Sequence, residues 1–324
     1  PVEARLAVDF RRPYDVRLVP VAAPWFAAAE GPTVVVTNRR HVKARCEVTL
    51  VASDWPPERQ SVTLAGRAEQ EVMFSQPGGL GAPMPRRLQV GVVGGGREFW
   101  TDLPVDWAAA PRLSRAVVVD GDLSDWPFRA DFHLTEEHQV VDVRGWSRHD
   151  LSAVACTAWD DDFLYLGVEV TDDEHVQMET GELIWTGDSV QFAIDALGNG
   201  GHAYDDDDYE YGLALTPGGP VIWRWHGAEY RHVGEVAFGD LAVRRGDCGT
   251  VYEMALPWRE LTPLEPKRDA TFGFTLAVND ADESRQGKNV REGAIQFTPG
   301  IIHEKDPSKF ARWRLIGALD GDGG

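Results

Sequence analysis

Short runs of alternating apolar and polar residues recur along the chain, and Gly, Pro, Asn and Asp interrupt them. A period of two residues is typical of β-strands with one buried face. No apolar stripe with the helical period of 3.6 residues continues beyond about three turns. The pattern therefore predicts an all-β fold built from β-sandwiches.

The first third of the chain contains five such runs, separated by Pro-rich and Gly-rich stretches. They lie at residues 33–37, 44–51, 71–74, 88–93 and 98–103, and residues 76–85 are expected to form a loop. A stretch of about 110 residues with this many short strands is typical of an immunoglobulin-like sandwich. We therefore predict an immunoglobulin-like β-sandwich over residues 1–113.

Residues 114–324 contain longer runs, in which alternation separates an apolar face from a polar one. The apolar positions, which should be buried together, are Leu164, Leu166, Val168, Val170, Val190, Phe192, Ile194, Tyr252, Met254, Leu256, Phe272, Phe274, Leu276 and Val278. The opposite positions include Glu169, Gln191, Glu210, Glu253 and Asn279. Small residues separate these polar side chains, so they form either a shallow hydrogen-bonding surface or an ordinary solvated sheet face.

Composition and charge narrow the functions that this fold could have. The chain has 324 residues with 12 Trp and 13 Phe, enough to fill large cores, and its net charge is −20. Residues 1–113 hold 14 Lys and Arg against 12 Asp and Glu, whereas residues 114–324 hold 18 against 40. This shift predicts a domain boundary near residue 113. The acidic balance argues against nucleic acid as a partner, and no apolar run approaches the ~20 residues that cross a bilayer.

Four motifs in the second part point to a family. They are D-G-D-L-S-D-W at 120–126, W-T-G-D-S-V-Q-F-A-I-D at 185–195, V-N-D-A-D-E at 278–283 and D-P-S-K-F at 306–310. Together they resemble a family 9 carbohydrate-binding module, one of the DOMON-like (jelly-roll) β-sandwiches, over about residues 115–317. The resemblance implies non-catalytic binding of a saccharide or polysaccharide, structural calcium, a covalently linked catalytic domain, and a secreted or cell-surface location.

The resemblance also implies a sugar site centred on Trp185. An aromatic ring can cover the apolar face of a pyranose, while polar side chains bind its hydroxyls. Gln191 stands where the family has an acid, no Arg lies near Gly212, and residues 298–305 contain no second Trp. Trp223 and Trp225 could supply the missing platform or belong to the core. The remaining candidate polar partners are Glu210, Glu253 and Asn279.

Acidic residues gather at the ends of the expected strands, at 160–162, 172–174, 205–208 and 280–283. Calcium takes six to eight oxygen ligands, mostly from carboxylates and carbonyls, so such clusters either bind calcium or form a solvated acidic surface. We select Asp205, Asp206, Asp207 and Asp208 as the candidate calcium ligands. No segment has the frame of an EF-hand loop.

Other functions remain open. Because the sugar clamp of the family is incomplete, the second part could instead be a structural spacer or a docking module. A haem-binding DOMON-like domain is a further alternative, with Met178, Met254, His175 and His226 available as ligands, although C-x-x-C-H is absent. The sequence has no G-x-S-x-G, H-E-x-x-H, P-loop or Rossmann motif, so we expect no catalysis within this chain.

Overall fold

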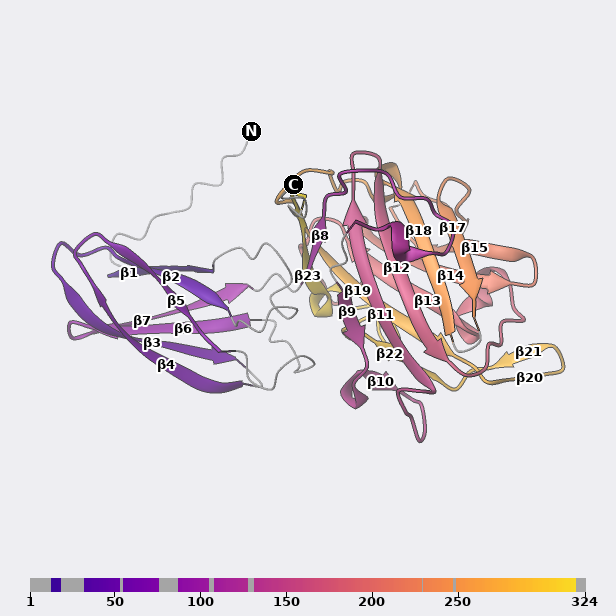
Figure 1. Cartoon of the computed structure of the whole chain (residues 1–324), viewed down its shortest axis with the longest axis horizontal. Helices are drawn as coiled ribbons and strands as arrows, with labels where there is room; N and C mark the ends of the chain where they lie inside the picture. The colour runs from indigo at the N-terminus through magenta and orange to yellow at the C-terminus, as the bar shows by residue number, and fades with distance from the viewer. Residues whose placement is uncertain are drawn as a thin grey trace. The chain divides into compact units, whose positions relative to one another are not determined.

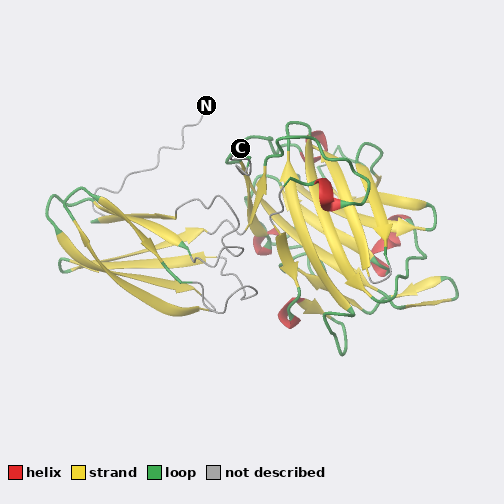
Figure 2. Cartoon of the chain, in the orientation of Figure 1, coloured by secondary structure: helices red, strands yellow, loops and turns green. Residues whose placement is uncertain are grey.

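The computed structural model describes residues 13–18, 32–52, 55–75, 87–104, 108–127, 131–228, 230–246 and 249–318. The chain divides into two compact units, Pro1–Val105 and Asp106–Gly324. Strands dominate both units, and the helices described are short 3₁₀ turns (Figure 2). None of the described helices is long and apolar enough to cross a membrane.

The first unit is a sandwich of two antiparallel sheets (Figure 1). The three-stranded sheet has the order β1 (Tyr14–Leu18), β2 (Thr33–Asn38) and β5 (Glu69–Met73). The four-stranded sheet has the order β4 (Trp55–Leu64), β3 (Ala44–Ala52), β6 (Arg87–Gly94) and β7 (Arg97–Pro104). Apolar residues of both sheets form one core, and the Tyr14 hydroxyl in β1 donates to the Gly94 carbonyl in β6, 3.1 Å away.

The second unit contains two larger sheets that lie face to face (Figure 1). The five-stranded sheet has the order β17 (Asp240–Arg245), β18 (Gly249–Pro257), β12 (Phe163–Asp172), β11 (Leu151–Trp159) and β9 (Asp131–Leu134). The nine-stranded sheet runs through β10 (Val140–Val141), β22 (Gly293–Gln296), β19 (Thr271–Asp280), β13 (Ser189–Asp195), β14 (Asp208–Thr216), β15 (Gly219–His226) and β16 (Gly234–Glu235). Its remaining strands are β23 (Ala311–Ile316), which pairs with β19, and β8 (Ala108–Pro111), which pairs with β23.

Strand β8 lies before residue 113, where the charge shift predicts the boundary between domains. It pairs in parallel with β23, near the end of the second unit, with Trp313 opposite Ala108. The division by compactness accordingly falls between Val105 and Asp106. Composition did not signal this pairing, because β8 is short and consists of Ala and Pro.

The apolar faces predicted from alternation form the core of the second unit. Leu164, Val190, Met254, Phe274 and the other residues on these faces are buried. Aromatic rings fill the centre, since Phe274 lies 4.6 Å from Trp313 and 6.2 Å from Phe192 between ring centroids. This burial of large apolar side chains is the main source of stability for such a sandwich.

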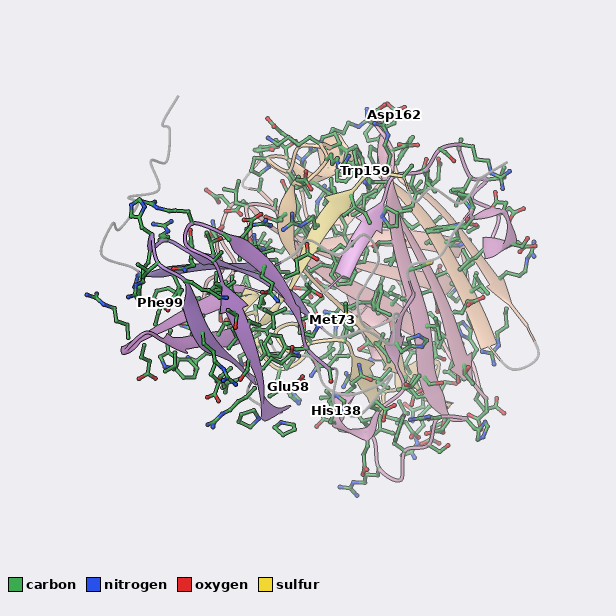
Figure 3. All side chains as sticks on the ribbon, turned by 60° about the vertical axis from the view of Figure 1, so that its left-hand side comes forward. Glu58, Met73, Phe99, His138, Trp159 and Asp162 are labelled. Carbon is green, nitrogen blue, oxygen red and sulfur yellow. The ribbon has the colours of Figure 1, made fainter. Side chains whose placement is uncertain are left out.

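Turns at the strand ends use many of the acidic side chains. Asp160 follows β11, and its carboxylate accepts the backbone N–H groups of Asp162 and Phe163, each at 2.8 Å. Figure 3 shows Asp162 beside Trp159, at one end of the sandwich, with His138 toward the other end. An Asp in a turn thus satisfies backbone donors that the sheet leaves unpaired.

The polar face of the nine-stranded sheet is not an ordinary solvated face. Gln191, Glu210 and Asn279 are all buried. Side chains of the 3₁₀ turn η3 (Gly181–Thr186) and of the loop between β22 and β23 line the groove in which these polar residues lie. The sheet therefore has a core on one face and a lined groove on the other.

Candidate functional site

A groove with a volume of about 700 Å³ lies on the outer face of the nine-stranded sheet. Of the residues selected from the sequence, Trp185, Gln191, Glu210, Trp225 and Asn279 line it together. They come from η3, β13, β14, β15 and β19. The groove also contains residues that the sequence analysis did not select, namely Asp142, Glu182, Leu183, Tyr204, His226, Arg291, Ile301, Ile302, His303 and Lys305.

Trp185 lies on η3, a turn whose two sides differ in character. Its neighbour Ile184 is fully buried, whereas Trp185 itself is 41% exposed. The guanidinium carbon of Arg291 lies 5.6 Å from the centroid of the Trp185 ring, within the range of a cation–π contact. The turn therefore presents an indole to the groove while Ile184 anchors it to the fold.

The polar side chains of the sheet form one hydrogen-bonded row along the groove. The Asn279 amide donates to Gln191 Oε1 at 3.3 Å, and the Gln191 amide donates in turn to Glu210 Oε1. Arg291 donates to Asn279 Oδ1 at 3.3 Å, and Lys305 Nζ lies 2.6 Å from Glu210 Oε1. The row thus has a cation at each end.

Trp225 covers the backbone of Gly212 on the neighbouring strand. A Cβ built at Gly212 would lie only 2.3 Å from the edge of the Trp225 ring. The Trp225 indole N–H donates to the Glu182 carbonyl in η3 at 2.9 Å. Trp223 has a different environment, because its ring packs toward Gly181, and it does not line the groove. The two Trp residues therefore do not form a joint platform.

A second aromatic surface lies around Tyr204. Its ring lies 4.8 Å from that of His226, and Lys305 Nζ lies 6.0 Å from the Tyr204 centroid. Burial, followed by the neighbouring Glu210 carboxylate, raises the pKa of Tyr204 well above 10. The Tyr204 phenol therefore stays protonated at neutral pH.

Glu253 lies outside this groove. It belongs to β18 in the five-stranded sheet and is fully buried. Its carboxylate accepts the backbone N–H groups of Asp120 and Gly121 and the indole N–H of Trp126, each at 2.9 Å. Alternation identified the polar face of β18 but not the loop that covers it. We assign Glu253 to holding the 120–126 loop and leave it out of the binding site.

The predicted calcium ligands form a turn that leads into β14, whose first residue is Asp208. The carboxylate of Asp205 accepts the N–H of Asp207 at 3.1 Å, and that of Asp208 accepts the N–H of Asp205 at 2.7 Å. Asp208 Oδ1 is buried and has no hydrogen-bond partner in the described part of the chain. Burial, together with Asp195, Asp205 and Asp207, raises the pKa of Asp208 to about 7.

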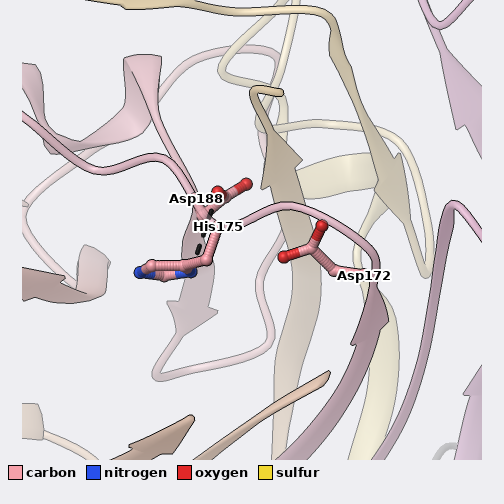
Figure 4. A group of neighbouring side chains, drawn as sticks. All are labelled: Asp172, His175 and Asp188. Carbon is pink, nitrogen blue, oxygen red and sulfur yellow. Dashed lines mark ion pairs between the residues drawn. The ribbon is translucent and has the colours of Figure 1, made fainter. Parts of the chain in front are cut away.

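A second acidic cluster lies where β12, β13 and β19 meet. Oxygen atoms of Asp172, Asp280 and Asp282 lie within 4.8 Å of one another, as do ligand atoms of Asp172, His175 and Asp188 (Figure 4). Burial above all, and then the neighbouring carboxylates, raises the pKa of Asp188 to about 9 and that of Asp280 to about 8. These groups lie far apart in the sequence, so no local motif revealed the cluster.

The residues considered as haem ligands have separate places in the fold. Met254 is fully buried in the core, and His175 Nδ1 lies 3.7 Å from Asp188 in the acidic cluster. His226 lines the groove, and the backbone N–H of Met178 donates to Asn289.

The comparisons with known proteins concern the second unit. A sequence model of the family described as carbohydrate family 9 binding domain-like matches residues 119–318. Endo-1,4-beta-xylanase A of Thermotoga neapolitana is 28% identical over 210 residues, which cover 61% of this chain and 17% of the relative. Exoglucanase XynX of Acetivibrio thermocellus is 27% identical over 213 residues, which cover 63% of this chain and 17% of the relative.

The chain thus spans only about a sixth of the length of these curated relatives. Among solved structures, a family 9 carbohydrate-binding module from Caldicellulosiruptor kristjanssonii in complex with glucose is 19% identical, with a TM-score of 0.49. That match covers 67% of this chain and all of the other. Because the family model matches most of the chain, the protein belongs to the carbohydrate family 9 binding domain-like family.

Proposed function

We propose that the second unit binds a saccharide without catalysis, in the groove that Trp185 borders. The observation that carries this proposal is the placement of a 41% exposed indole beside a buried row of amide and carboxylate side chains. Sugar rings have an apolar face and a rim of hydroxyls, and this groove offers a partner for each.

Each part of the groove has a distinct role in this proposal. Trp185 covers the apolar face of a pyranose ring, and Trp225 forms an apolar floor. Gln191 and Asn279 can both donate and accept, and Glu210 accepts from hydroxyls. Arg291 supplies a cation beside the Trp185 ring and Asn279. The sequence pattern did not indicate this residue, because it follows a short hairpin without marked alternation.

We further propose that the ligand is a β-linked xylan or glucan and that the chain is an accessory part of a larger extracellular protein. The names of the curated relatives, xylanase and exoglucanase, support the polysaccharide class. Their matched regions make up 17% of their length, which supports an accessory role beside a separate catalytic region. Finding the native protein in the culture medium of its producing cells would support this location, and finding it only inside the cells would contradict it.

Calorimetric titration with xylo- and cello-oligosaccharides tests the binding proposal. Trp185 is 41% exposed, which is roughly 100 Å² of a Trp side chain. A sugar covering half of that area would gain about 1.2 kcal/mol, so Trp185→Ala should weaken binding about tenfold. Absence of binding to any oligosaccharide, or unchanged affinity in Trp185→Ala, would refute the site.

Trp100 provides a matched control. It lies on β7 of the first unit and is 45% exposed, so it resembles Trp185 in exposure but belongs to another unit. We expect Trp100→Ala to leave the affinity unchanged. A loss equal to that of Trp185→Ala would show that a general property of exposed Trp residues, and not this groove, accounts for binding.

We also propose that the acidic groups hold structural calcium. Asp172, Asp280 and Asp282 fit this ion, because they offer carboxylate oxygens as metal ligands. In addition, Asp280 Oδ2 is buried without a hydrogen-bond partner among the described residues. Asp208 Oδ1 is likewise buried without a hydrogen-bond partner in the described part of the chain, so the 205–208 turn is a second candidate site. A bound divalent cation would offset the repulsion between these carboxylates.

Thermal unfolding with calcium and with a chelator tests the metal proposal. Calcium at about 100 times its dissociation constant adds about 2.7 kcal/mol of stability, which raises the Tm of a unit of this size by about 5–10 °C. Asp280→Asn should abolish the shift if calcium binds the cluster of Asp172, Asp280 and Asp282, and Asp208→Asn should abolish it if calcium binds the 205–208 turn. An equal Tm with calcium and with chelator would contradict the proposal.

For the first unit we propose an immunoglobulin-like fold that acts as a spacer. The strand orders β1-β2-β5 and β4-β3-β6-β7 support it, because sandwiches of this class divide seven strands between two such sheets. The unit expressed alone should fold cooperatively and bind none of the oligosaccharides. Saccharide binding by the isolated unit would contradict the spacer role.

A further inference from the structure

We propose that Asn289 is a positioning residue that sets the Trp185 turn for ligand binding. This inference rests on the proposed saccharide function of the groove. Asn289 lies in β21 (Lys288–Val290), which forms a hairpin with β20 (Glu283–Arg285) that projects from one end of the unit (Figure 1). Asn289 does not line the groove, so it would act through other residues.

The side-chain amide of Asn289 joins both ends of the segment that carries Trp185. Its Oδ1 accepts the backbone N–H of Met178 at 2.7 Å. Its Nδ2 donates to Gln177 Oε1 at 3.0 Å and to Thr186 Oγ1 at 3.1 Å. One amide therefore fixes the residues just before η3 and the last residue of η3.

The partners of Asn289 hold the turn itself. Gln177 donates to the carbonyl of Ile184 at 2.8 Å and to that of Asp188 at 3.2 Å. Thr186 Oγ1 donates to the carbonyl of Leu183 at 2.8 Å. Carbonyls on both sides of Trp185 are thus bound by side chains that Asn289 orients. A 3₁₀ turn has weak internal hydrogen bonds, so such external donors determine its geometry.

Close packing at Gly187 supports the same role. A Cβ built there would lie 2.4 Å from Asn289 Nδ2 and 2.6 Å from the Val176 carbonyl. Only glycine allows the amide to approach the backbone this closely. The hairpin also reaches the groove directly, since β21 leads to Arg291, which contacts the Trp185 ring and Asn279. The hairpin therefore supplies one contact residue and one positioning residue.

The test compares Asn289→Ala with Ser284→Ala in the full chain, by titration with the oligosaccharide that the wild type binds most tightly. Ser284 lies opposite Asn289 on the same hairpin and is exposed, so it serves as the matched control. Loss of the amide contacts should weaken binding about tenfold, and Ser284→Ala should bind like the wild type. Asn289→Asp keeps the acceptor for Met178 and loses both donors, so we expect an intermediate affinity.

A double-mutant cycle with Trp185→Ala separates positioning from a general structural effect. If Asn289 acts by placing Trp185, the double variant should bind no more weakly than Trp185→Ala alone. Additive losses would overturn the proposal, as would wild-type affinity in both Asn289→Ala and Asn289→Asp. If the wild type binds no saccharide, the proposed function itself fails. If Trp185→Ala weakens binding while Asn289→Ala and Asn289→Asp bind like the wild type, the function stands and only the positioning role of Asn289 fails.

Discussion

Replacing Gly212 with Ala should impair the groove while leaving the sandwich folded. Gly212 lies on β14, beneath the Trp225 ring. A Cβ at this position would lie 2.3 and 2.6 Å from two ring atoms of Trp225 and 3.0 Å from Ile184 Cδ1. Because carbon atoms pack at about 3.5–4.0 Å, the ring must move by at least ~1 Å.

The size of the effect follows from what that movement breaks. Trp225 donates its indole N–H to the Glu182 carbonyl at 2.9 Å, and Glu182 lies on the same turn as Trp185. Loss of this hydrogen bond costs about 1 kcal/mol, and the raised floor displaces a bound sugar from the Gln191 and Glu210 side chains. We expect the affinity to fall about tenfold to a hundredfold.

Gly218→Ala is the matched control for this experiment. Gly218 lies in the turn between β14 and β15, and a Cβ there would meet only Thr216 Oγ1, at an ordinary distance of 3.6 Å. Calorimetric titration of both variants, together with their Tm, measures the comparison. Wild-type affinity in Gly212→Ala, or an equal loss in Gly218→Ala, would refute the role assigned to Trp225.

Three further predictions concern residues around the groove and the acidic cluster. Glu253→Ala leaves two buried donors, the Gly121 N–H and the Trp126 indole N–H, and the part-buried Asp120 N–H without an acceptor. It should lower the free energy of unfolding by about 3 kcal/mol in urea denaturation and leave the saccharide affinity unchanged, whereas a loss of affinity in folded protein would return Glu253 to the site. Lys305→Met removes the cation beside Glu210 and the hydrogen bond to the Ile301 carbonyl, so calorimetric titration should show the saccharide affinity reduced about fivefold. Wild-type affinity in this variant would show that binding does not need the ion pair between Lys305 and Glu210. The pKa values of about 9 for Asp188 and about 8 for Asp280 mean that, without a bound metal ion, the folded state binds more protons than the unfolded state. With a chelator present, the Tm should therefore fall as the pH rises from about 5 to 8, and a rising Tm would contradict the raised pKa values of these buried acids.

Strand alternation predicted the residues that share a face better than it predicted what covers that face. The burial of Val190, Phe192 and Phe274 follows directly from the period of two. The same rule brought Gln191 and Asn279 together, because neighbouring antiparallel strands place their polar positions side by side. It assigned Glu253 to the same function, since alternation does not distinguish the two sheets of a sandwich.

Residues outside the strands were harder to find. Tyr204, Arg291 and Lys305 lie in loops, where no periodicity indicates the direction of a side chain. The acidic residues show the same limit, because the run at 205–208 is evident in the sequence, whereas Asp172 and Asp280 meet only when two sheets pack. The hairpin that carries Asn289 had a Gln-Gly turn as its sole local signal, with φ of 54° at Gln286 and 75° at Gly287.

The most direct test of saccharide binding in this groove is a crystal structure of the chain with the xylo- or cello-oligosaccharide that binds most tightly. We expect a sugar ring against the exposed face of Trp185, with hydroxyls within hydrogen-bond distance of Gln191 and Glu210. A sugar bound elsewhere on the unit, with this groove unchanged and empty at saturating ligand, would contradict the proposed function.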